Sequence, residues 1–134
     1  MTKGDWLDLS VLERKKYNCL SEVMELSRQM GEALDRNDDV SVRMLLALRQ
    51  DPILQLEELK QAIARKRDGL EPEEQDRLSA LAAGASPKGE SEESYAKQAG
   101  SARRLLERVV ELDRRLSIRL GGKNSFYSKA ETKS

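Results

Sequence analysis

The sequence predicts an all-α protein, an elongated antiparallel helical bundle of three long helices plus one short helix. Ala, Glu, Lys, Leu and Arg make up 71 of the 134 residues, a composition typical of long or coiled helices. Val, Ile and Thr together number only 11, and five residues are aromatic, which is too few for the half-buried surfaces of a β-rich fold. Apolar residues also recur at steps of three and four, as they do along one face of a helix.

The first long helix is predicted to run from about Leu9 to Leu34. Its apolar stripe includes Leu9, Leu12, Cys19 or Leu20, Val23, Leu26 and Met30. Lys16 and Ser27 also occupy stripe positions and weaken the seam slightly, although a lysine stem can lie along a neighbouring helix with its charge in water. The polar segment 35–39 ends the periodicity and predicts a tight turn. Asp38 or Asp39 is expected to cap the following helix.

The second long helix contains a proline within its apolar stripe. The stripe comprises Val42, Leu45 or Leu46, Arg49, Ile53, Leu56, Leu59 and Ile63. Asp51 as a cap with Pro52 in the first turn would begin a new helix, whereas a continuous helix would kink where proline removes a hydrogen bond. We favour the kinked helix because the apolar positions stay in phase across Pro52.

Glycine and proline mark the connections that follow. A basic run, 65–67, precedes Gly69, which is expected to end the second helix in a left-handed conformation. Pro72 and the acids around it open a short third helix that extends to Gly84. Residues 84–93 contain no large apolar side chain and predict a mobile loop.

The last long helix has the most regular stripe of the chain. Its stripe positions are Tyr95, Gln98 or Ala99, Ala102, Leu105 or Leu106, Val109, Leu112, Leu116 and Leu120. Gly121 and Gly122 end this helix, so residues 1–122 are expected to form one helical bundle domain. Residues 123–134 are polar and basic and predict a disordered tail.

The residue types present argue against catalysis. The chain has no histidine, which excludes imidazole bases, catalytic triads and most zinc sites. Cys19 is the only cysteine and cannot form an internal disulfide, which favours a reducing cytoplasm. The acids of 71–76 lack the pattern of a calcium loop, and the glycine pairs do not follow a strand as a phosphate-binding loop requires. We therefore expect no enzyme activity, no cofactor and no metal.

The charge pattern also argues against nucleic-acid binding. Residues 94–134 hold ten basic and four acidic residues, a net charge of +6. Glu107, Glu111 and Asp113 alternate with the arginines and would repel a phosphate backbone, so we expect a solvated helix face rather than a nucleic-acid site. No 18 apolar residues run together, so no membrane insertion is expected.

The apolar stripe of the last helix is the main candidate for a partner-binding surface. We expect Val109 and Leu112 to act mainly in the core, and Leu116 and Leu120 to face a partner groove near the end of the helix. Two aromatic residues in the tail, Phe126 and Tyr127, are expected to serve as a mobile anchor for the same partner, because aromatic side chains often dominate binding energy. The alternative is an inert tail.

This layout resembles the FlgN-type flagellar export chaperones of the type III secretion system. The resemblance is carried by a Leu-rich first helix, the turn Asn37-Asp38-Asp39, the second-helix residues Leu45-Leu46, Arg49, Ile53 and Leu56, and the trailing segment 124–129. Arg49 stands where an arginine is common in that family. Pro52 and the loop of 84–93 depart from the pattern.

The resemblance implies a non-catalytic cytoplasmic chaperone. Such a protein binds the C-terminal helices of flagellar hook-associated proteins, keeps them unassembled and delivers them for export. An amphipathic substrate helix can be covered by helix-in-groove packing. The alternative function is a structural coiled-coil adaptor or a homodimerising helical protein, in which the same apolar stripe pairs with a scaffold or with itself. A nucleic-acid binder would instead show steep salt dependence.

Overall fold

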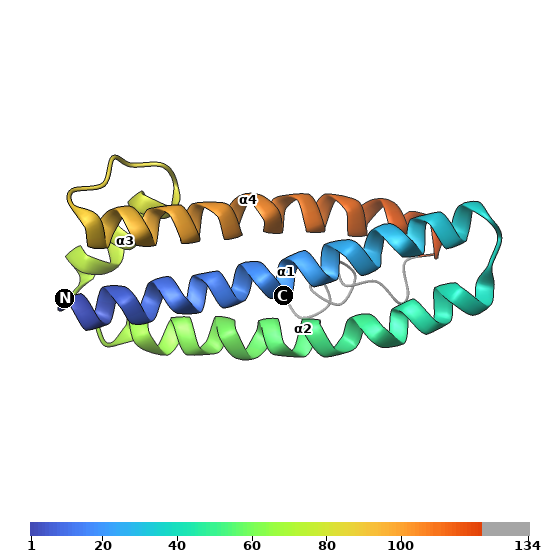
Figure 1. The fold of residues 1–134 in the computed structure, drawn as a ribbon, viewed down its shortest axis with the longest axis horizontal. Helices are drawn as coiled ribbons and strands as arrows, with labels where there is room; N and C mark the ends of the chain where they lie inside the picture. Colours follow the sequence, from blue (N-terminus) through green and yellow to red (C-terminus); the bar gives the residue numbers. More distant parts are fainter. Residues whose placement is uncertain (122–134) are drawn as a thin grey trace.

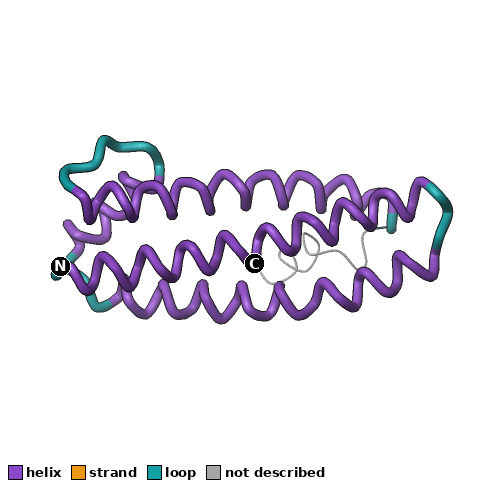
Figure 2. The backbone as a smooth tube through the Cα atoms, viewed as in Figure 1, coloured by secondary structure: helices purple, strands orange, loops and turns teal. Residues whose placement is uncertain are grey.

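The computed structural model describes residues 1–121, and within this range it contains four helices and no strand (Figure 2). The helices are α1 (Lys3–Asp35), α2 (Asp39–Asp68), α3 (Pro72–Ala82) and α4 (Glu90–Arg119). Three of them are 30 to 33 residues long and α3 has 11 residues. The predicted elongated bundle of three long helices and a short one is confirmed (Figure 1).

The long helices are arranged around α1. Helix α1 packs along its length against both α2, which runs antiparallel to it, and α4, which runs parallel to it. The backbones of α2 and α4 approach each other far less closely, so side chains must fill the space between them. Helix α3 packs against α4 at the end of the bundle that holds the N-terminus (Figure 1). Helix α1 spans the bundle from one end to the other (Figure 1).

Caps set the starts of the first two helices. The Thr2 hydroxyl accepts a hydrogen bond from the Asp5 amide, and the Asp5 carboxylate accepts one from the Thr2 amide. This capping box starts α1 six residues before the predicted Leu9, because capping satisfies the free amides of the first turn regardless of the apolar pattern. Asp38 caps α2 as expected, with its carboxylate 3.1 Å from the Ser41 amide nitrogen.

Helix α2 continues through Pro52 without a break. The structure thus confirms that the helix is continuous and excludes a new helix starting at Asp51, while the kink at Pro52 stays a prediction. Pro52 is buried, and its ring lacks the amide that would bond to the carbonyl of Leu48. Core packing on both sides of the proline holds the two halves in one helix, since Leu45 and Leu56 are both buried.

The end of α2 differs from the prediction. Gly69 has a φ of −81°, which is right-handed, so the expected left-handed cap is wrong at this position. The side-chain amide of Gln75 instead donates hydrogen bonds through Nε2 to the carbonyls of Arg67 and Leu70, at 2.8 and 3.2 Å. A side chain from α3 thus satisfies the carbonyls that a left-handed turn would otherwise satisfy.

Helix α4 begins earlier than expected. Residues 84–93 were predicted to form a loop, but the structure is helical from Glu90 onward, after Gly89 at a φ of 94°. Three acids in the first turn stabilise this start through the helix dipole. Glu92 also pairs with Arg77 of α3, which fixes the first turn against the neighbouring helix. The predicted tail, 123–134, lies outside the described residues.

Buried side chains form three clusters along the bundle. The cluster beside α3 contains Leu9, Leu78, Leu81, Tyr95 and Ala99. The middle cluster contains Cys19, Leu20, Val23, Leu56, Ala102, Leu105 and Val109. The cluster at the opposite end contains Met30, Ala33, Val42, Leu45 and Leu116.

Replacing Gly69 with alanine is expected to leave stability unchanged or raise it by about 0.4–1 kcal/mol, because alanine restricts the unfolded chain. The backbone at Gly69 is right-handed, and an added Cβ would meet its nearest atom, the Lys66 carbonyl oxygen, at 3.7 Å. Chemical denaturation measures the change. Gly84→Ala is the matched control: Gly84 has a φ of 111°, so this change is expected to cost roughly 1 kcal/mol. Equal losses of stability at Gly69 and Gly84 would contradict the right-handed conformation of Gly69.

Candidate functional site

A buried polar cluster joins the three long helices at one point. Arg49 of α2 donates hydrogen bonds through Nη1 to Asp113 Oδ1 of α4, at 2.8 Å, and to Ser27 Oγ of α1, at 3.0 Å. The exposed fraction is 1% for Arg49 and 0% for Asp113 and Ser27. We call this set the polar cluster. It bridges α2 and α4 where their backbones stay apart.

The polar cluster constrains the packing more strongly than apolar contacts do. A buried charge that loses its partner costs several kcal/mol, so alternative registers of the helices that separate Arg49 from Asp113 are strongly disfavoured. The Arg49 Nε atom has no hydrogen-bond partner within residues 1–121, so the guanidinium is only partly satisfied. In some proteins a buried ion pair contributes specificity of packing rather than net stability.

The signal of this cluster is present in the sequence but does not stand out there. From the sequence, Ser27 weakens the first apolar stripe, Arg49 is a member of the second stripe and of the FlgN-type resemblance, and Asp113 belongs to a solvated helix face. All three occupy stripe positions, and their chemistry is complementary. A polar residue at the buried position of each of three helices is a pattern that predicts a shared contact.

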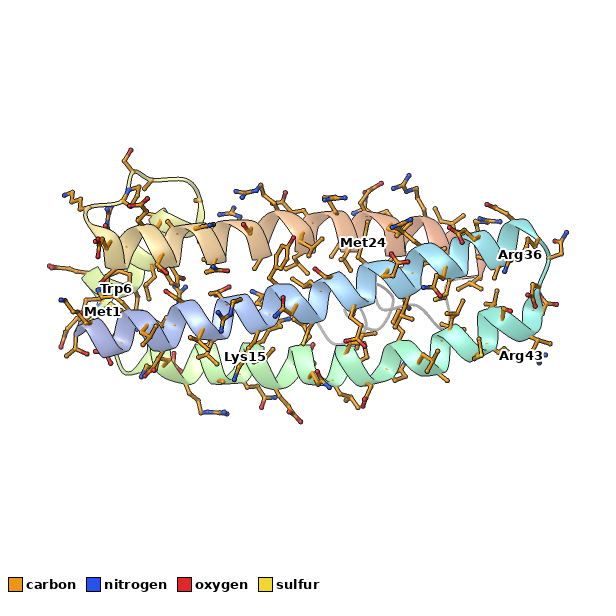
Figure 3. The ribbon with its side chains drawn as sticks, viewed as in Figure 1. Met1, Trp6, Lys15, Met24, Arg36 and Arg43 are labelled. Atoms are coloured by element: carbon orange, nitrogen blue, oxygen red, sulfur yellow. The ribbon has the colours of Figure 1, made fainter. Side chains whose placement is uncertain are left out.

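The end of the bundle beside α3 is covered on several sides. The Met1 amino group pairs with Glu74 Oε2 at 2.6 Å, which ties the start of the chain to α3. The rings of Trp6 and Tyr95 meet edge to face with centroids 5.8 Å apart. Figure 3 shows Met1 and Trp6 side by side at this end. The covered end leaves little apolar surface for a partner, although Leu7 is exposed there.

The opposite end has no such cover among the described residues. Five partly buried leucines pack against its core cluster, and we call them the leucine rim: Leu26, Leu34, Leu46, Leu112 and Leu120. Ile118 stands next to the rim on α4 with 77% of its surface exposed. The Arg119 guanidinium pairs with Asp35 at 3.0 Å and holds the end of α4 against the end of α1.

The residues proposed from the sequence for partner binding lie in different environments. Val109 and Leu116 are 0% and 2% exposed and lie in the core, so Leu116 does not face a groove as we expected. Leu116 is covered because it packs in the core cluster with residues of α1 and α2. Leu112 and Leu120 belong to the leucine rim. Phe126 and Tyr127 lie outside the described residues, and their binding role stays a prediction.

Buried titratable groups lie near the covered end. Burial raises the pKa of the Glu13 carboxyl, while the charges of Lys16 and Arg67 oppose this shift. Burial also raises the pKa of Tyr95 to about 12, and the negative charge of Glu13 adds to the effect. Glu13 is 6% exposed, so ionisation of its buried carboxyl opposes folding.

Cys19 behaves as a small core residue, as expected from its stripe position. It is 7% exposed, and its thiol donates to Gln55 Oε1 at 3.7 Å. Burial raises the pKa of this thiol, and the nearby charge of Glu22 raises it further. The thiolate that a nucleophile needs is therefore disfavoured. Cys19 and Gln55 line a groove of about 490 Å³ between α1 and α2.

Comparisons of this chain with protein-family models, curated proteins and solved structures find no match. Within residues 1–121, no group of His, Cys, Asp and Glu side chains is placed to hold a metal ion. No helix in the same range is both long and apolar enough to cross a membrane. The leucine rim, the polar cluster and the exposed helix faces are therefore the candidate functional features of the described residues.

Asp113→Ala is expected to destabilise the protein by about 3–5 kcal/mol, because it leaves the Arg49 guanidinium buried without its charge partner. The double change Arg49→Met with Asp113→Leu is expected to be near neutral or stabilising, because well-packed apolar side chains can replace a buried ion pair. Urea denaturation measures both.

The control for this pair is Glu25→Ala, which removes an exposed ion pair with Arg28 at 2.9 Å. It is expected to cost less than about 1 kcal/mol. If Asp113→Ala were as mild as Glu25→Ala, Arg49 would not depend on Asp113 as its buried charge partner.

Glu13→Gln is expected to raise the melting temperature at pH 7. The raised pKa means that the folded protein holds the Glu13 proton more tightly than the unfolded chain. Stability from this group is therefore present at low pH and is lost as the pH rises past the ordinary value of 4.5 and through the raised one. The gain from Gln should shrink below pH 4.5. Exposed Glu22→Gln serves as the control, and an equal gain there would contradict the role of burial.

Proposed function

We propose that this protein is a non-catalytic cytoplasmic chaperone that binds an amphipathic helix of a partner protein. The observation that carries the proposal is the leucine rim at the end of the bundle that α3 does not cover. One end of the core is closed by α3, Trp6 and the N-terminus, while the other end presents partly buried leucines from α1, α2 and α4.

A helix is the partner element that fits this surface. The rim leucines project from three helices around one core cluster, so an apolar helix face laid across them would extend the existing helix packing. Leucine side chains in such positions supply roughly 1.5–3 kcal/mol each when they pass from exposure to full burial. Part of that stabilisation is still unused at the rim because its leucines are only partly buried.

The FlgN-type resemblance supplies the identity of the partner. Under it, the bound helices are the C-terminal helices of flagellar hook-associated proteins, which must stay unassembled before export. The long antiparallel hairpin of α1 and α2 is compatible with that layout, and Arg49 of the shared motif belongs to the polar cluster. A coiled-coil adaptor is the alternative if hook-associated proteins do not bind.

Leu120→Asp is expected to weaken binding of a hook-associated protein from the same organism by at least about tenfold, or 1.4 kcal/mol, because it places a charge in the apolar contact. Titration calorimetry with purified proteins measures the affinity, and far-UV circular dichroism verifies that the helices persist. Leu120 lies at the C-terminal cap of α4, where the core is least affected.

Leu7→Asp is the matched control because Leu7 is 63% exposed at the covered end, and this variant should bind normally. The pair Phe126→Ala with Tyr127→Ala tests the tail in the same titration. A change within about twofold, under roughly 0.4 kcal/mol, would reject the tail anchor. If the wild-type chain bound no hook-associated protein, the chaperone proposal would be wrong.

A further inference from the structure

Helix α2 carries a second apolar surface on the side away from the core. Val40 is 71% exposed, Leu54 60%, Met44 55% and Leu48 52%, and Ala47 between them is also exposed. We call these five residues the outer stripe. Large apolar side chains gathered on one exposed face mark interaction surfaces more often than isolated ones do. The outer stripe contains none of the rim leucines.

The spacing of the outer stripe is that of a helix that pairs with another helix. Positions 40, 44, 47, 51 and 54 follow steps of four, three, four and three, which is the repeat of a coiled-coil seam. Asp51 occupies the single polar position of this repeat. The repeat covers 14 residue steps, or roughly 21 Å of helix.

We propose that a second copy of this chain covers the outer stripe, with the two α2 helices antiparallel about a two-fold axis beside Ala47. The sequence around Ala47 is self-complementary. Val40 and Leu54 each lie seven residues from it, and Arg43 and Asp51 each lie four residues from it. The axis therefore places Val40 opposite Leu54 of the second copy, and Arg43 opposite Asp51 of the second copy, with each pair formed twice.

Charge selects this arrangement over the parallel one. Arg43 and Asp51 are both exposed, and within residues 1–121 neither takes part in an ion pair. In the antiparallel dimer each guanidinium meets a carboxylate, whereas a parallel dimer would place Arg43 beside Arg43 and Asp51 beside Asp51. Like charges at a helix interface are destabilising.

Side-chain size is consistent with the same axis. Ala47 would face its own copy, and a small residue at that point allows the two helices to approach closely. Met44 and Leu48 lie on one flank of the stripe, and a two-fold axis brings this flank onto the same flank of the second copy. The interface is only one helix wide, so we expect a weaker dimer than a standard-sized interface gives.

Sedimentation velocity of the full chain, from about 1 to about 300 μM, tests the dimer. The wild type should pass from monomer to dimer over this range. Arg43→Asp and Asp51→Arg should each weaken the dimer by about tenfold or more, because each creates two like-charge pairs. The double variant with both changes should restore the wild-type affinity to within about threefold. A wild type that stays monomeric, or a double variant that fails to recover, would overturn the proposal.

Cross-linking tests the position of the axis. In a Cys19→Ser background, Ala47→Cys should form a disulfide-linked dimer under mild oxidation, because Ala47 faces its own copy. Ala64→Cys is the matched control: Ala64 is exposed on α2 outside the stripe, and it should cross-link at least about tenfold more slowly. Equal rates at the two positions would overturn the proposed axis.

The partner-binding proposal and the dimer proposal can be overturned independently of each other. Leu120→Asp is expected to abolish partner binding and leave the dimer intact, since Leu120 belongs to the rim and not to the stripe. If instead the charge reversals at Arg43 and Asp51 abolished partner binding while the chain stayed monomeric, the outer stripe would be a partner site and the dimer proposal would be wrong.

Discussion

The ion pair between Arg49 and Asp113 is the constraint on which the rest of the bundle depends. Helix α1 contacts both of its neighbours along its length, but α2 and α4 stay apart, and this pair bridges them with Ser27 of α1 at its edge. Apolar stripes alone permit several registers between long helices. A buried charge pair permits only those in which the two groups meet, because separation leaves each charge unpaired in a region without water.

The polar cluster lies between the middle core cluster and the cluster at the end away from α3, and the two ends of the bundle differ. Toward the N-terminus, α3 closes the core, and the same enclosure that buries Tyr95 also buries the Glu13 carboxyl. Toward the other end, the helices of the hairpin and the end of α4 leave partly buried leucines around the core cluster. A closed end that carries stability, and an opposite end where residues 1–121 leave leucines partly exposed, suit a protein whose proposed task is to hold a partner's helix.

The outer stripe adds a second surface with a different geometry. The leucine rim gathers leucines from three helices at one end, whereas the outer stripe runs along one face of α2 and is self-complementary about Ala47. A dimer through α2 would bring two leucine rims into one particle. Two binding ends in one particle increase the effective concentration of a second partner helix, which strengthens capture without any new contact.

Helix propensity and apolar periodicity act over a few residues, so the sequence alone was enough to place four helices, a cap at Asp38 or Asp39 and the continuity of α2 through Pro52. It misjudged the start of α1, the Gly69 cap and the start of α4; at the last two, Gln75 and Glu92 bond to another segment. Which stripe positions are core and which are surface depends on the tertiary packing. Leu116 is buried, Leu120 is not, and the polar cluster forms, because each outcome depends on what the neighbouring helices place opposite.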